Sequence, residues 1–139
     1  MTGKVFFDSN ILLYAEFRDN SDKYRLAKDL LTKKVKNSSI YLSTQVINEF
    51  YVNALRKGKT SQDIQNVLQQ FFDDFNILSV STETVQDCWR VFNRYKFSYW
   101  DSLIVASALE SQSAILFTED LTNGQIIDNT LKVVNPFER

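Results

Sequence analysis

Four acidic side chains carry the chemistry of this sequence, which contains no histidine among its 139 residues. Asp8 and Asp120 each follow an apolar, strand-like run, Asp101 opens an apolar helix-like segment, and Glu49 lies within one helical turn of apolar neighbours. Carboxylates brought together in a partly desolvated pocket repel one another, which raises their pKa values. A hard divalent cation, which prefers oxygen ligands, relieves that repulsion. The pattern therefore predicts a metal-dependent hydrolase that acts on a phosphodiester.

The elements that must position these side chains alternate along the chain. Short apolar runs predict five strands, and segments with apolar residues at three- and four-residue steps predict helices between them. Such alternation predicts right-handed crossovers and a mainly parallel, roughly five-stranded sheet covered on both faces, a three-layer α/β/α fold. We expect a single domain over residues 1–139. The predicted strands are 4–7, 40–43, 76–80, 114–118 and 132–134, the last at the sheet edge. The first predicted helix starts near Ser9, and another starts at residue 81 or 82. The remaining predicted helices cover residues 22–36, 44–56, 61–74 and 100–112.

One predicted helix carries an apolar face of its own. In the helix that starts at residue 81 or 82, we expect Val85, Cys88, Trp89 and Phe92 to face the core. For Cys88, the interpretation as a small buried apolar side chain is favoured over a reactive thiol.

The topology indicates how the carboxylates meet. Ligands of an open parallel sheet bind beyond the carboxyl ends of the strands, where Asp8 and Asp120 fall. If the first and fourth strands are neighbours, these two carboxylates come within reach of one metal ion. Each residue also has a structural interpretation: Asp8 and Asp101 as helix N-caps, Asp120 as a turn residue and Glu49 as a rim residue. Glu119 is an equally plausible ligand beside Asp120. The co-occurrence of the four favours the metal site.

Composition excludes several classes of function. Without histidine, the chain has no histidine-based zinc site, no Ser-His-Asp or Cys-His nucleophile and no histidine acid–base nuclease chemistry. Its single cysteine forms no intrachain disulfide, and its N-terminus lacks the features of a signal peptide, so we expect a reducing cytoplasm. No apolar run approaches the roughly 20 residues of a membrane span. Phosphate-binding glycine loops are also absent, which disfavours a nucleotide cofactor.

Charge gives a weaker indication. The net charge of −1 does not describe a globally basic nucleic-acid-binding protein. Two local clusters could contact phosphates, although each also suits the carbonyl end of a helix, which is the favoured interpretation. These clusters are Lys33, Lys34 and Lys36, and Arg56, Lys57 and Lys59.

Four ordered motifs carry a resemblance to a known family. They are Val5–Leu12 (VFFDSNIL), Ile47–Phe50 (INEF), Tyr99–Ala108 (YWDSLIVASA) and Leu116–Leu121 (LFTEDL). In order, spacing and total length the chain resembles the PIN-domain ribonucleases, and most of all the toxin component of VapBC-type toxin–antitoxin pairs. The resemblance implies a PIN-like fold.

The resemblance also implies roles for individual residues. Asp8, Glu49, Asp101 and Asp120 would bind one or two Mg²⁺ or Mn²⁺ ions and support hydrolysis of an RNA phosphodiester by water. The Thr-x-Asp pattern selects Asp120 as the last ligand, with Glu119 as an auxiliary. The polar positions that orient the carboxylates correspond to Asn10 and Thr118.

The partners implied by the resemblance are an RNA substrate, a small antitoxin protein and a second copy of the chain. Tyr14, Phe17, Tyr24 and Leu31 in the early helices could line a groove for an amphipathic antitoxin segment, although the core interpretation is favoured for most of them. Two other functions remain open: a PIN nuclease of RNA maturation or decay, and a non-catalytic RNA-binding module. A phosphatase or a DNA flap nuclease also fits the bare chemistry.

Overall fold

The computed structural model describes residues 3–138 and contains a mainly parallel sheet in the order β3-β2-β1-β4-β6-β5. Every neighbouring pair is parallel except β5 with β6. The strands are β1 (Gly3–Phe7), β2 (Ser38–Ser43), β3 (Asn76–Leu78), β4 (Ile115–Phe117), β5 (Ile126–Ile127) and β6 (Leu131–Val134). The predicted α/β/α class is confirmed.

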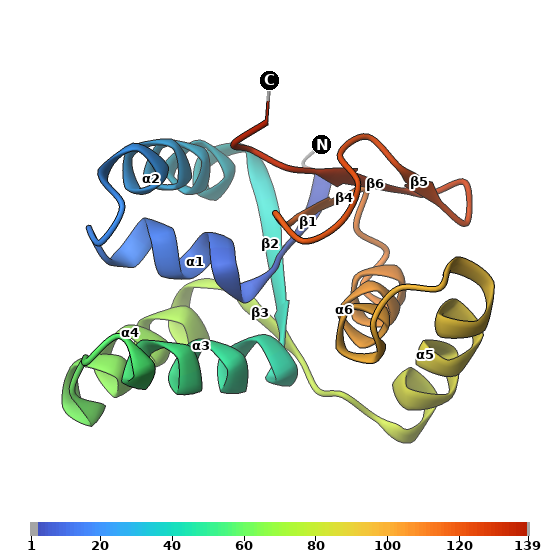
Figure 1. Ribbon diagram of the computed structural model, residues 1–139, viewed down its shortest axis with the longest axis horizontal. Helices are drawn as coiled ribbons and strands as arrows, with labels where there is room; N and C mark the ends of the chain where they lie inside the picture. Colours follow the sequence, from blue (N-terminus) through green and yellow to red (C-terminus); the bar gives the residue numbers. More distant parts are fainter. Residues whose placement is uncertain (1–2, 139) are drawn as a thin grey trace.

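Helices cover the two faces of this sheet. Figure 1 shows α1 to α4 on one side of the strands and α5 with α6 on the other. The helices are α1 (Ser9–Glu16), α2 (Ser21–Asn37), α3 (Thr44–Arg56), α4 (Ser61–Asp74), α5 (Thr82–Tyr95) and α6 (Tyr99–Glu110). Side chains of Asn20, Ser43, Thr60, Ser81 and Ser98 accept hydrogen bonds from the first turns of α2 to α6. These polar caps explain where the helices begin.

The core is built around the central strand β1. Phe6 and Phe7 are fully buried, and the ring of Phe7 packs against Phe117 of β4 with 4.9 Å between centroids. β1 lies between β2 and β4, so the first and fourth of the predicted strands are neighbours, which was the condition for Asp8 and Asp120 to meet. The carboxyl ends of β1 and β4 therefore meet at one edge of the sheet, where the chain continues into Asp8 and Thr118.

The sheet differs from the prediction at one edge. Residues 3–138 form six strands where about five were predicted, because the two-residue strand β5 is too short to leave an apolar pattern. β5 pairs antiparallel with β6, so the strand predicted at 132–134 lies between β4 and β5 and the predicted edge position is wrong. Asp128 and Asn129, both with positive φ, form the tight turn that joins β5 to β6.

The predicted core face of α5 is partly wrong. Cys88 is buried and Val85 packs beside it, but the side chains of Trp89 and Phe92 are 52% and 40% exposed. The buried face of α5 against α6 instead follows Thr84, Cys88 and Val91. Two large aromatic residues thus stay at the surface, where Phe92 and Trp89 both contact Tyr99.

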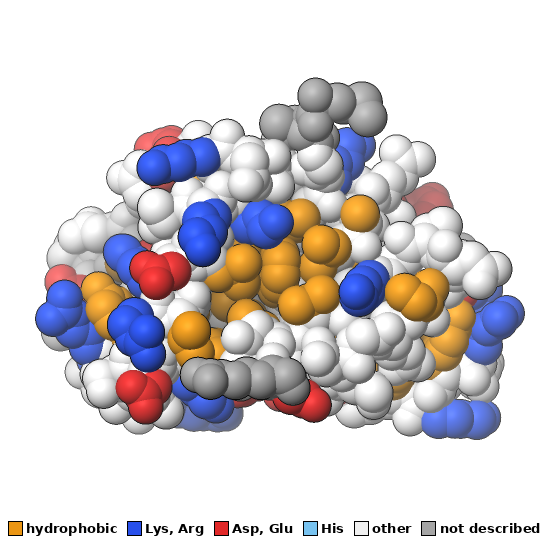
Figure 2. All heavy atoms as spheres, turned by 90° about the horizontal axis from the view of Figure 1, so that it is seen from above, with side chains coloured by type: hydrophobic (Ala, Val, Ile, Leu, Met, Phe, Trp, Pro, Cys, Tyr) orange, Lys and Arg blue, Asp and Glu red, His pale blue; other side chains and the backbone are white. Residues whose placement is uncertain are grey.

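Charge is unevenly distributed over the surface. Figure 2 shows the molecule from above, where several Lys and Arg side chains lie on either side of a central hydrophobic area. Locally basic surface therefore coexists with the net charge of −1. Within residues 3–138, none of the helices combines the length and the apolar character needed to cross a membrane.

Candidate metal centre

Asp8 begins the site at the carboxyl end of β1. Its backbone N–H donates to the Phe117 carbonyl of β4 over 2.9 Å, which extends the β1–β4 pairing by one residue. Its carboxylate accepts from the Ser9 N–H at 2.7 Å, so Asp8 is also the N-cap of α1. The structural interpretation of this residue as a cap is therefore correct and compatible with a functional role. Asp8 is only 4% exposed.

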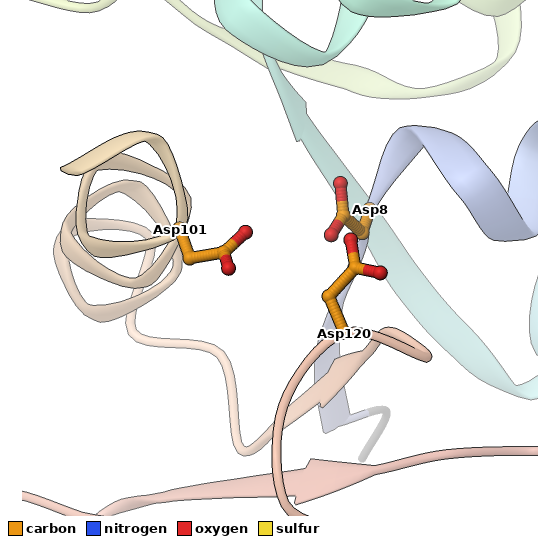
Figure 3. Close-up of side chains that lie close together, drawn as sticks. All are labelled: Asp8, Asp101 and Asp120. Carbon is orange, nitrogen blue, oxygen red and sulfur yellow. The ribbon is translucent and has the colours of Figure 1, made fainter. Parts of the chain in front are cut away.

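Three aspartates converge at this edge. One carboxylate oxygen from each of Asp8, Asp101 and Asp120 lies within 4.8 Å of the other two. Figure 3 shows Asp120 beside Asp8, and Asp101 reaching toward both from α6. Asp101 is not an N-cap, because Ser98 caps α6 and its hydroxyl accepts a hydrogen bond from the Asp101 backbone N–H. The side chain of Asp101 is therefore left available to the cluster.

Glu49 stands beside this cluster rather than within it. Its carboxylate accepts from the Ser9 hydroxyl at 3.4 Å and from the Gln45 amide at 3.2 Å. The same Gln45 nitrogen donates to the Trp100 carbonyl at 3.0 Å. Gln45 thereby connects α3, which carries Glu49, to the turn of α6 that carries Asp101.

Asn10 and Thr118 hold two of the aspartates in place. The Thr118 hydroxyl donates to Asp8 at 2.8 Å and accepts from the Asp120 N–H at 3.1 Å. The Asn10 amide donates to the Asp120 carboxylate at 3.0 Å. Both residues thus contact the carboxylates directly, as expected for side chains that orient metal ligands.

Glu119 points into a different environment. One of its oxygens accepts from the Tyr14 hydroxyl and the other from the Lys23 ammonium, both at 2.7 Å. These contacts tie the loop after β4 to α1 and α2. Because both oxygens are engaged, the structure brings Asp120, and not Glu119, into the cluster with Asp8 and Asp101.

Three carboxyl groups of the site have raised pKa values, and none of the three has an ion-pair partner among the described residues. The pKa of Asp8 is raised to about 7, mainly by burial; the charges of Glu49 and Asp120 act in the same direction, and the hydrogen bonds from Thr118 and Ser9 act against it. Burial also raises the pKa values of Glu49 and Asp120, and Asp101 adds to both effects. Within residues 3–138, no salt bridge reaches Asp8, Asp101 or Asp120.

These observations fit a divalent cation. The donor set consists of carboxylate oxygens, which Mg²⁺ and Mn²⁺ prefer, from three residues whose oxygens already lie within 4.8 Å. A bound cation would supply the positive charge that the surrounding chain does not provide, and would favour the ionised forms of these carboxyl groups.

The sequence patterns did not indicate that Ser9, Gln45, Tyr14 or Lys23 would contact residues of the site. Gln45 lies four residues before Glu49 on α3, a spacing that places two side chains on one helix face. That spacing is the signal that could have identified it. The pairing of Lys23 with Glu119 spans 96 residues, and no local pattern encodes it.

The fold and the site together define a class of protein. The family model of the PIN domain matches residues 5–122, and the chain belongs to the PIN-domain family, a family of nucleases that use divalent metal ions. Among curated protein sequences, no significant match was found.

Several solved structures that resemble the chain come from toxin–antitoxin systems, among them VapBC systems. A chain of the toxin–antitoxin complex from Klebsiella pneumoniae has a TM-score of 0.71 and 23% identity, covering 97% of this chain and 99% of that one. A chain of VapBC2 from Rickettsia felis, solved with a fragment of promoter DNA, has a TM-score of 0.69 and 20% identity, and the match covers 95% of this chain and 99% of that one. VapC20 of Mycobacterium tuberculosis, a Sarcin-Ricin loop cleaving toxin, has a TM-score of 0.69 and 14% identity, and the match covers 81% of this chain and 86% of that one. At these identities, the similarity concerns the fold.

Proposed function

We propose that the protein is a Mg²⁺- or Mn²⁺-dependent endoribonuclease and the toxin of a toxin–antitoxin pair. The observation that carries this proposal is the convergence of Asp8, Asp101 and Asp120 at the carboxyl edge of a PIN-domain sheet, without a salt bridge to any of them among residues 3–138. The metal, when bound, would act as a Lewis acid that stabilises the charge developing on the phosphodiester.

The chain's own residues fix the geometry of this reaction. Asp8, Asp101 and Asp120 would hold the metal, with Glu49 at the rim to accept a proton or a hydrogen bond from water near the reacting phosphorus. Thr118 and Asn10 would prevent rotation of the Asp8 and Asp120 carboxylates. Positioning of this kind reduces the reorganisation that the site needs during the reaction.

We also propose that residues 1–139 form a single PIN domain. β6, which lies beyond the residues matched by the family model, pairs with β4 inside the same sheet. This pairing ties the C-terminal part of the chain to the strand that leads to Asp120.

The partners in this proposal are a small antitoxin protein and a second copy of the chain. Support for an antitoxin comes from the neighbours, several of which were solved as VapBC complexes. Of the early-helix residues predicted to line an antitoxin groove, Leu31 is buried in the core, whereas Tyr14, Phe17 and Tyr24 are partly exposed. A role in RNA maturation or decay uses the same carboxylates, and growth inhibition on expression distinguishes the toxin.

The experiment is cleavage of a labelled structured RNA by wild-type protein and by the Asp8→Asn/Asp101→Asn double variant. Each is assayed with Mg²⁺, with Mn²⁺ and with EDTA, and circular dichroism confirms that the variant is folded. We expect cleavage that needs metal and disappears in the double variant. Cleavage that persists in the folded variant, or in EDTA, would contradict the assigned site.

A further inference from the structure

A groove opens beside the metal centre between α3 and the first turn of α6. Its volume is about 810 Å³, within the size range of ligand sites in proteins. One wall is a face of α3 on which the polar residues Gln45, Asn48, Glu49, Asn53 and Arg56 surround the apolar Val52. Trp100 lines the groove from α6, together with the apolar Leu103 and Val80. Glu49 and Trp100, which precedes Asp101, make the groove continuous with the acidic cluster.

We propose that this groove binds single-stranded RNA next to the cleaved phosphodiester, with an unpaired base stacked on Trp100 and a phosphate held by Arg56. The proposal rests on the ribonuclease function proposed above and adds the surface that grips the substrate. Unpaired bases in protein–RNA complexes stack on aromatic side chains, and arginine contacts the phosphates.

Trp100 has the exposure and the support that a stacking platform needs. Its side chain is 62% exposed, although it is large and apolar. The ring of Tyr99 contacts it edge to face at 5.4 Å between centroids, and Gln45 holds its backbone carbonyl at 3.0 Å. The indole is thereby presented to the groove on a fixed backbone.

The α3 wall supplies polar and positive groups along the same direction. Gln45 and Arg56 are 11 positions apart, so this wall extends about 16 Å at 1.5 Å per residue. Asn48 and Asn53 lie between them with amides that can donate to and accept from base edges or sugar hydroxyls. Arg56 donates to Asn53 at 3.3 Å and keeps its remaining guanidinium N–H groups for another acceptor.

These features favour a nucleic acid over a second copy of the chain as the occupant. The centre of a protein–protein interface is depleted of charged residues, whereas this groove contains Arg56 and ends at Glu49. A phosphate on Arg56 and a scissile phosphate at the acidic cluster account for both ends of the groove. An apolar partner surface would remove water from both charged groups without offering either of them a partner of opposite charge.

Trp100 itself provides the first measurement. The chain has two tryptophans, so a Trp89→Phe protein reports on Trp100 alone. Titration of this protein with a single-stranded oligoribonucleotide in EDTA, where no metal-dependent cleavage occurs, is expected to quench its fluorescence. Arg56→Gln should weaken binding and lower the salt dependence by about one counterion, whereas Arg25→Gln, an equal charge loss on α2 outside the groove, should not.

The second measurement separates this proposal from the ribonuclease function. We expect Trp100→Ala to weaken RNA binding and raise KM about ten-fold, the scale of one base–aromatic stack, and Trp100→Phe to restore most of the loss. Metal-dependent cleavage with unchanged KM in Trp100→Ala would overturn the groove and leave the nuclease standing. If RNA quenches the fluorescence and binding depends on Trp100, but the wild type does not cleave RNA, the groove proposal stands and the nuclease proposal is wrong.

Analytical sedimentation tests whether a second copy of the chain, instead of RNA, occupies the groove. If Trp100→Ala converts a dimer to a monomer while RNA affinity stays unchanged, a second copy of the chain fills the groove and the RNA proposal is wrong. Absence of any RNA binding by the wild type would overturn it as well.

Discussion

Asp128 and Asp8 are aspartates in two regions of one molecule, and only Asp128 meets a cation. Asp128, in the turn between β5 and β6, bonds Arg90 of α5 at 2.6 Å and the Tyr95 hydroxyl at 2.9 Å. The hydrogen bond from Arg90 is the main reason that the pKa of Asp128 is lowered, whereas burial raises the pKa of Asp8 to about 7. The chain supplies its own cation to Asp128, whereas within residues 3–138 no salt bridge reaches the three aspartates of the acidic cluster, as the proposed metal site requires.

The same contrast holds between adjacent residues. Glu119 is paired with Lys23 at 2.7 Å and fastens the loop after β4 to α2, while Asp120 joins the cluster of uncompensated carboxylates. Two acidic residues in sequence thus have different roles because their side chains leave the loop in different directions. The presence or absence of a cationic partner therefore distinguishes Glu119 from Asp120, the carboxylate that we propose as a metal ligand.

The largest effect in this comparison is expected at Thr118, which orients two residues of the cluster. Thr118→Val removes the hydroxyl that donates to Asp8 and accepts from Asp120, so ribonuclease activity should fall about 10- to 100-fold. Thr118→Ser keeps the hydroxyl and should retain most of the activity. Rates measured at several Mn²⁺ concentrations check this prediction, and equal rates for the Val and Ser variants would contradict it.

The raised pKa of Asp8 predicts how pH affects the metal-free protein. The folded pKa of about 7 exceeds the unfolded value near 3.9, so the folded state binds more protons and loses stability as pH rises through 7. Asp8→Asn has no such titration. Its melting temperature in EDTA should therefore exceed that of the wild type by an amount that grows between pH 5 and pH 8, by several degrees at roughly 4 °C per kcal/mol.

Thermal melts of both proteins across this pH range give the result directly. A difference in melting temperature that does not change with pH would contradict the raised pKa. Adding Mn²⁺ should raise the melting temperature of the wild type and leave Asp8→Asn nearly unchanged, because a ligand stabilises the state that binds it.

A smaller effect is expected in the region of Asp128. Arg90→Gln removes the cation from Asp128 and Asp87 and should lower the free energy of unfolding by about 1 kcal/mol, since these ion pairs are partly exposed. Metal affinity and RNA cleavage should not change. Urea denaturation and a cleavage assay on the same preparation measure both, and a large loss of cleavage would break the proposed separation of the two regions.

The smallest effect on the metal site is expected from Glu119→Gln. The variant weakens the contact with Lys23 but leaves Asp8, Asp101 and Asp120 intact, so the affinity for Mn²⁺ should change less than about three-fold. The free energy of unfolding should fall by up to ~1 kcal/mol, the contribution of one surface ion pair. Calorimetric titration with Mn²⁺ is the check. A loss comparable to that of Asp101→Asn would make Glu119 a ligand.

Local patterns predicted most of the fold and the elements of the site. The apolar run before Asp8 and the helical spacing around Glu49 and Asp101 placed these residues on the elements where they are found. The convergence of Asp8 with Asp120 followed from parallel strands that share one carboxyl edge, once the adjacency of β1 and β4 was assumed.

What the sequence did not predict depends on contacts between distant residues. The exposure of Trp89 on α5 is set by how α5 docks on α6, and apolar character alone does not reveal it. The pairing of Glu119 with Lys23 likewise depends on where α2 passes the β4 loop. The two-residue strand β5 is defined by its partner β6 and has no period of its own.

The central claim is that the acidic cluster binds a divalent cation and the neutralised aspartate does not. Free Mn²⁺ measured by electron paramagnetic resonance during titration of the wild type, Asp101→Asn and Asp128→Asn tests it directly, with the same chemical change made in each region. We predict that the wild type and Asp128→Asn bind Mn²⁺ alike and that Asp101→Asn binds at least about ten-fold more weakly. Equal binding by the two variants, or no binding by the wild type, would contradict the account.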